Sequence, residues 1–128
     1  MFTQIPSLDD RSFNEILNDD TKPVVIIFYA EWSGNCQLIE STVCRYADQF
    51  QREISFYKID TEFNFTVTAE YGIKELPTLL FFKNGWLRDR VKGTANKNEL
   101  LKRLLQFVTK EIPIILDLND DTIKMTIN

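Results

Sequence analysis

One stretch of the chain, residues 23–30, constrains the fold more than any other. It reads Pro-Val-Val-Ile-Ile-Phe-Tyr-Ala, an almost unbroken run of β-branched and aromatic residues. Such a run predicts a strand that is buried on both faces, because a strand with one face in water alternates between apolar and polar residues. Strands of this kind lie at the centre of a sheet that helices cover on both sides. The sequence therefore predicts the α/β class.

The remaining segments supply the layers around this strand. Turn residues separate runs with helical and strand periodicity. Helices are predicted over 7–18, 36–50 and 98–111, a short helix within 61–73, and further strands over 54–60, 77–85 and 86–93. The order α-β-α-β-α-β-β-α places a βαβ crossover early and a hairpin late. We therefore expect a mixed β-sheet with helices on both faces.

The chain of 128 residues is long enough for one ordinary domain, which we assign to residues 1–111. Residues 112–128 form a C-terminal extension, in which two short β-rich pieces flank Asn-Asp-Asp. This pattern predicts an added edge hairpin or a tail docked on a helix. The alternative is a strand that binds a partner or a second copy of the chain, so dimerisation through this extension stays open.

Composition excludes several classes of function. The net charge is −4, which argues against a nucleic acid partner, because phosphate binding needs a basic surface. The sequence has no His and only two Cys, which removes His-based catalysis and the common zinc sites, so we expect no metal and no cofactor. The first residues lack the pattern of a signal peptide, and no apolar run approaches the roughly 20 residues that cross a membrane. We expect a cytoplasmic protein with no membrane partner.

The segment that follows the buried strand carries the candidate chemistry. It reads Ala-Glu-Trp-Ser-Gly-Asn-Cys and ends at Cys36, with the spacing of a Cys-x-x-Cys redox motif but with Ser33 in the first position. One interpretation is a redox site without its nucleophile, and the other is a turn that happens to end in Cys. A later segment, residues 71–85, reads Tyr-Gly-Ile-Lys-Glu-Leu-Pro-Thr-Leu-Leu-Phe-Phe-Lys-Asn-Gly.

These two segments together resemble the thioredoxin family, and the resemblance covers about residues 5–111. It implies the thioredoxin fold, with Pro77 in the cis form facing the motif. Family oxidoreductases carry Cys-Gly-Pro-Cys, in which the first Cys is a thiolate nucleophile at a helix N-terminus and the second resolves the mixed disulfide. Ser33 stands at the nucleophile's position, Cys36 at that of the shielded resolving Cys, and Asn35 replaces Pro.

Two further departures agree with the loss of the nucleophile. The family buries an Asp beneath the motif as a proton relay and often pairs it with a Lys in the neighbouring strand. The matching residues here are Ile27 and Phe56. A buried charge is costly, and an apolar pair at these positions is expected to pack well. The three changes together predict a site released from dithiol chemistry.

Two functions follow from the resemblance. The first is a binding module that holds a protein or peptide partner in the groove of the family. The residues that match this groove are Trp32, Ser33, Gly34, Asn35, Ile73, Leu76, Pro77 and Thr78. The alternative is a thiol–disulfide oxidoreductase or monothiol redox protein acting through Cys36, with glutathione as a conceivable co-substrate. The exposure and reactivity of Cys36 distinguish the two.

The second cysteine, Cys44, lies eight positions after Cys36 on the same predicted helix. Eight residues of helix span about 12 Å, whereas a disulfide needs Cα atoms within about 7 Å. The two thiols therefore cannot pair within an intact helix. We interpret Cys44 as a half-buried residue of the helix surface, with an intermolecular or regulatory thiol as the alternative.

Overall fold

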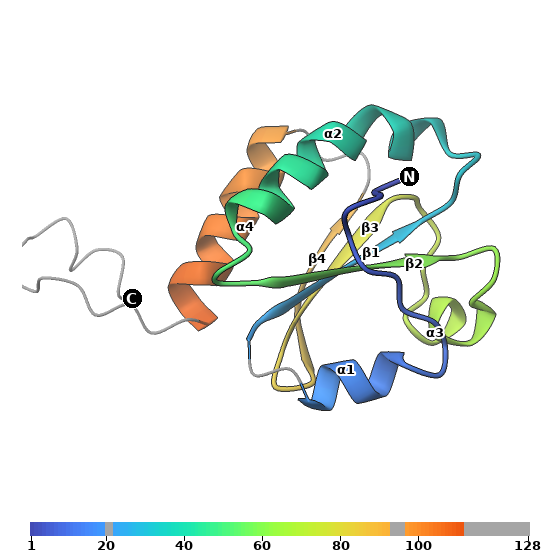
Figure 1. Ribbon diagram of the computed structural model, residues 1–128, viewed down its shortest axis with the longest axis horizontal. Coiled ribbons are helices and arrows are strands. Elements are labelled where there is room, and N and C mark those ends of the chain that lie inside the picture. The colour runs from blue at the N-terminus through green and yellow to red at the C-terminus, as the bar shows by residue number, and fades with distance from the viewer. Residues whose placement is uncertain (20–21, 93–96, 112–128) are drawn as a thin grey trace, which may run out of the picture.

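In the part of the chain that the structure describes, four strands form one mixed sheet with helices on both faces, as predicted (Figure 1). The structure is a computed structural model, and it describes residues 1–19, 22–92 and 97–111. The strands stand in the order β2-β1-β3-β4. The elements are α1 (Phe13–Asp19), β1 (Val24–Tyr29), α2 (Gly34–Gln49), β2 (Ser55–Asp60), α3 (Phe65–Glu70), β3 (Thr78–Lys83), β4 (Trp86–Lys92) and α4 (Lys97–Glu111).

The central strand explains the layering. β1 pairs in parallel with β2 and antiparallel with β3, and all six of its residues are buried. Alternate side chains, such as Ile27 and Phe28, point to opposite faces and belong to two separate apolar clusters. Side chains of α2 and α4 complete the first cluster, and side chains of α1 and α3 complete the second. Figure 1 shows these two helix pairs above and below the sheet.

The late hairpin also follows its prediction. β3 and β4 are antiparallel and are joined at Asn84 and Gly85. Both residues have positive φ angles, 54° and 80°. A two-residue hairpin turn with positive φ at both positions matches the twist of the strands it joins, which is why Asn-Gly is a strong hairpin sequence.

The N-terminal segment differs from its prediction. The helix expected from Ser7 begins only at Phe13. The preceding residues lie along the open edge of β2, where the Leu8 N–H donates to the Lys58 carbonyl at 2.8 Å and the Lys58 N–H donates to the carbonyl of Pro6 at 2.9 Å. These pairings hold residues 6–8 extended along the sheet edge, and residues 10–12 then form a turn that leads into α1.

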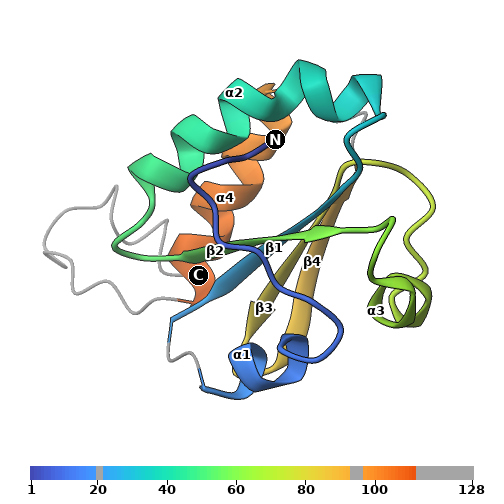
Figure 2. The same ribbon diagram turned by 45° about the vertical axis from the view of Figure 1, so that its right-hand side comes forward.

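The elements around the motif gather at one end of the molecule. The turn before α2, the helix α3 and the loop that leads into β3 all lie on the right in both Figure 1 and Figure 2. This end is where β1 and β2, being parallel, both finish. The predictions for residues 112–128, a hairpin or a docking tail, lie outside the described residues.

Candidate functional site

Ser33 is the residue that begins α2. Its Oγ accepts a hydrogen bond from the backbone N–H of Cys36 at 3.2 Å, and its own backbone is extended, with φ −79° and ψ 117°. This is the geometry of an N-cap, in which a side-chain oxygen satisfies an N–H group that has no partner inside the helix. Only 5% of Ser33 is exposed. The hydroxyl at the first position of the motif therefore stabilises the start of the helix.

Cys36 lies within the first turn of α2 and points into the protein. None of its surface is exposed, and it is a free thiol. It belongs to the apolar cluster between the sheet and α2, together with Ile27 and Tyr29. A thiol in this environment behaves as a small apolar side chain, and a reagent or substrate cannot reach its sulfur without a local opening of the helix start.

The residues beneath the motif are apolar, as the sequence predicts. Ile27 has no exposed surface, and Phe56 is 8% exposed and lies in the same cluster. Lys58 stands opposite Ile27 on β2, and its Nζ donates to the carbonyls of Met1 and Phe2 at 2.8 and 3.0 Å. The ammonium group is therefore engaged by the N-terminal segment, a contact that sequence reasoning missed.

A groove of about 390 Å³ opens beside the motif. Five of the predicted binding residues line it, and these are Trp32, Ser33, Asn35, Ile73 and Leu76. The Leu76–Pro77 peptide bond is cis. Among the hydrogen bonds between described residues, none uses the N–H or the C=O of Leu76.

The other predicted binding residues take different positions. Gly34 is exposed on the first turn of α2, where a Cβ atom would meet nothing within 4 Å. Pro77 is buried. Thr78 is 2% exposed, stands between Phe28 and Lys92 in the sheet, and donates its hydroxyl to the carbonyl of Glu75 at 2.6 Å. The Thr78 side chain therefore supports the loop, and the binding role of this residue stays a prediction.

Three further residues line the groove and were missed from the sequence: Thr61, Thr68 and Lys74. Thr61 follows β2 directly, and its N–H donates to the carbonyl of Tyr29 at 2.9 Å. Parallel strands bring the loops at their carboxyl ends to one edge of a sheet. Once 24–29 and 54–60 are taken as parallel neighbours, the residue after the second strand is a candidate for the site.

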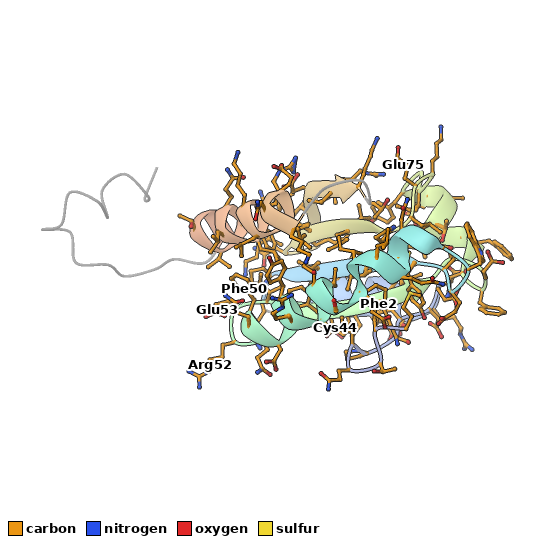
Figure 3. All side chains as sticks on the ribbon, turned by 90° about the horizontal axis from the view of Figure 1, so that it is seen from above. Phe2, Cys44, Phe50, Arg52, Glu53 and Glu75 are labelled. Atoms are coloured by element: carbon orange, nitrogen blue, oxygen red, sulfur yellow. The ribbon has the colours of Figure 1, made fainter. Side chains whose placement is uncertain are left out.

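Cys44 lies farther along α2 and is half-buried (Figure 3). Burial raises the pKa of its thiol, and the nearby carboxylate of Glu40 raises this pKa further, against smaller opposing effects of Lys58 and the N-terminal ammonium. It lines a separate cavity of about 340 Å³ at the edge of β2. It takes no part in the groove beside Ser33.

Metal and membrane sites are not supported by the described residues. Within residues 1–19, 22–92 and 97–111, no three His, Cys, Asp or Glu side chains gather in a way that would hold a metal ion. No helix in that part of the chain is both long and apolar enough to cross a membrane.

Comparison with known proteins places this geometry in a family. The thioredoxin family model matches residues 4–106, which is most of the chain. The chain belongs to the thioredoxin family. The thioredoxin of Porphyra purpurea is 36% identical over 106 residues, which cover 82% of this chain and 98% of that protein.

Other thioredoxins agree with this placement. The chloroplastic thioredoxin Y2 of Arabidopsis thaliana is 38% identical over 94 residues, or 73% of this chain and 56% of that protein. The oxidized form of mitochondrial thioredoxin 3 from Saccharomyces cerevisiae superposes with a TM-score of 0.71 at 23% identity, over 80% of this chain and 94% of that one. The match of structures confirms the thioredoxin fold, and the match of sequences confirms a thioredoxin-like domain of this redox family.

Proposed function

We propose that this thioredoxin-like domain is a binding module whose groove holds an extended segment of a partner protein, and that it does not catalyse dithiol exchange. The observation that carries the proposal is the state of the motif. The Ser33 hydroxyl caps α2, and the one thiol of the motif, Cys36, has no exposed surface. Thioredoxins generally act on protein substrates, which supports a protein as the partner.

Dithiol exchange needs a thiolate that attacks the disulfide of the substrate and a second thiol that resolves the mixed disulfide. Ser33 offers an alcohol at the position of attack, and an alcohol becomes a nucleophile near neutral pH only with a base beside it. The sequence contains no His to serve as that base. Ile27 provides no proton relay beneath the motif. The first step of the reaction therefore has no nucleophile and no base.

Binding of a peptide requires neither a nucleophile nor a base in the groove. An extended peptide that lies beside Leu76 can donate to its C=O and accept from its N–H, as a peptide does when it adds to the edge of a sheet. The half-buried Ile73 and the exposed ring of Trp32 border the same groove and supply apolar contact. None of these contacts depends on sulfur at position 33.

The test is reduction of insulin with dithiothreitol as the electron donor. The wild-type protein is expected to leave the rate at its uncatalysed value. The Ser33→Cys variant is expected to form a disulfide with Cys36 and to give weak activity, since Ile27 cannot relay a proton. The variant also serves as the positive control, because it shows that the fold and the assay support exchange once the nucleophile is present.

Two results would replace the proposal with the monothiol alternative. One is robust turnover by the wild-type protein. The other is attack of native Cys36 on glutathione disulfide, which forms a mixed disulfide and releases one reduced glutathione, and which intact-protein mass spectrometry detects as one added glutathione. The matched control is Cys44→Ala, which removes the other thiol and leaves Cys36 as the only sulfhydryl in the chain.

A further inference from the structure

Two phenylalanines at the start of α3 are turned toward solvent: Phe63 in the loop after β2, and Phe65, the first residue of the helix. Phe63 is 80% exposed and Phe65 is 73% exposed, while Trp32 in the motif is 67% exposed. Aromatic side chains of this size each carry about 150–250 Å² of surface, so the three leave roughly 400 Å² of apolar area in water. Exposed apolar patches of this size mark interaction sites on many soluble proteins.

The residue between the two phenylalanines is held in place by hydrogen bonds. Asn64 is 7% exposed, its side-chain N–H donates to the carbonyl of Asp60 at 2.9 Å, and its Oδ1 accepts the N–H of Asp10 at 3.0 Å. The carboxylate of Asp10 in turn accepts the N–H groups of Thr66 and Val67 at 3.3 and 2.8 Å. These bonds hold Asn64 inward, while Phe63 and Phe65 on either side of it are exposed.

The same surface reaches the rim of the groove. The indole N–H of Trp32 donates to the carboxylate of Glu62 at 2.6 Å, and Glu62 directly precedes Phe63. Trp32 also lines the groove beside Ser33. Trp32 and Phe63 therefore lie on two loops that this hydrogen bond ties together, and Phe65 follows at the first position of α3.

The charge of these loops is mostly negative. Residues 29–37 and 59–73 contain four acidic residues and no Lys or Arg, and the next residue, Lys74, is a cation that lines the groove. One of the four, Glu31, lies 3.3 Å from the N-terminal ammonium of Met1. A surface of exposed aromatic faces among carboxylates suits cationic side chains, since guanidinium and ammonium groups stack on aromatic rings and are attracted by the nearby negative charge.

We propose that Trp32, Phe63 and Phe65 form an aromatic docking surface for a basic segment of the partner protein, in which Arg or Lys stands next to an apolar residue. This proposal rests on the proposed function, because the segment continues out of the groove beside Leu76. The apolar residue covers the phenylalanine rings, and the cationic residue lies between the rings and the carboxylates. Electrostatic attraction of this kind speeds association and sets the choice of partner.

The experiment selects displayed random peptides of about twelve residues, an ordinary length for an extended ligand, on immobilised wild-type protein. The selected peptides are then synthesised and titrated by fluorescence anisotropy. We expect them to be enriched in Arg and Lys next to apolar residues and to bind more weakly as salt is raised. Phe63→Ser/Phe65→Ser is expected to weaken binding at least about tenfold, as loss of aromatic anchors does at other interfaces.

Two control variants separate this surface from the groove. Trp86→Ser removes an aromatic that is equally exposed, at 72%, but lies on the β3–β4 hairpin, and it is expected to leave affinity unchanged. Ile73→Ser removes an apolar contact from the groove without adding a charge, and it is expected to weaken every selected peptide. A thermal melt of each variant shows that it is folded.

The outcomes are distinct. Peptides that respond to Ile73→Ser but not to Phe63→Ser/Phe65→Ser, or that are neutral or acidic, overturn the docking surface and leave the groove function standing. Failure to select any peptide overturns both. If wild-type protein dimerises and Phe63→Ser/Phe65→Ser makes it monomeric in sedimentation, a second copy of the chain occupies the surface, and the basic-segment proposal is wrong.

Discussion

The centre of the site and its rim reverse the usual distribution of side chains. At the centre a hydroxyl and a thiol are buried, with Ser33 5% and Cys36 0% exposed. At the rim the large aromatic side chains of Trp32, Phe63 and Phe65 are in water. Residues at the centre are therefore engaged in holding the fold, whereas residues at the rim contribute little to the fold and are available for contact. Substitutions in the two regions should differ accordingly.

The largest effect is expected at the centre from Ile27→Asp, which puts a carboxylate where no surface is exposed. We expect the free energy of unfolding at neutral pH to fall by at least about 3 kcal/mol, the cost of an unpaired buried charge. Burial raises the pKa of this new carboxyl in the folded state, so the folded protein binds the extra proton and the loss shrinks as the pH is lowered. Urea unfolding across pH measures this.

Ile27→Asn is the matched control for this substitution, because it is polar but does not titrate. It should be destabilising with no added dependence on pH. Equal stability of Ile27→Asp and the wild-type protein would mean that the centre already accommodates a charge, and the contrast with the rim would be lost.

A pair of phenylalanines compares the two regions directly. Phe56→Ala, at the centre, should lower the free energy of unfolding by about 3 kcal/mol, because it leaves a cavity among buried side chains. Phe63→Ala, at the rim, should change it by no more than about 0.5 kcal/mol, as most exposed substitutions do. Chemical denaturation of both variants is the measurement. A large loss from Phe63→Ala would show that the rim is part of the core.

A smaller effect is expected from Ser33→Ala. Removing the N-cap leaves the Cys36 N–H without its 3.2 Å partner, which should lower the free energy of unfolding by about 1 kcal/mol. Ser41→Ala, at an exposed position inside α2, is the control and should be neutral or slightly stabilising, because Ala is the better helix former. Equal free energies of unfolding for Ser33→Ala and Ser41→Ala would contradict the capping role of Ser33.

The smallest effect concerns Cys44, away from both regions. Its pKa is raised mainly by burial and then by Glu40, so less thiolate is present at a given pH. Alkylation of Cys44 in the native protein should therefore be slower than in the unfolded chain and should move to higher pH. Glu40→Gln, which removes the second cause and leaves the first, should speed the reaction by no more than about threefold. If Glu40→Gln leaves the alkylation rate unchanged, burial alone raises the pKa of Cys44.

Much of this arrangement could be predicted from local patterns. The apolar run at 23–30 predicted the central strand of the sheet, and Asn84-Gly85 predicted the hairpin turn. Both predictions succeed because each depends on residues that are adjacent in the chain. The start of α1 could not be predicted in this way. Its preceding residues pair with Lys58, about fifty positions away, and that pairing overrides helical spacing.

Prediction of the candidate site from local sequence has the same limit. The spacing of Ser33 and Cys36 located the turn, and a Ser at the start of a helix is itself a sign of an N-cap, so the role of the hydroxyl was within reach of the sequence. The exposure of Phe63 and Phe65 was not. Phenylalanine in a sequence indicates burial, and the residue between these two is held inward partly by a contact with Asp10, 54 positions away.

The most direct test of a sealed, unreactive centre is alkylation of Cys36 in the native protein. Cys44→Ala leaves it as the only thiol, and intact-protein mass spectrometry follows its reaction with iodoacetamide over a range of pH. We expect almost no modification of the folded protein and complete modification after unfolding in urea. Reaction of native Cys36 faster than a free thiol at slightly acid to neutral pH would contradict the account and make Cys36 a working redox thiol.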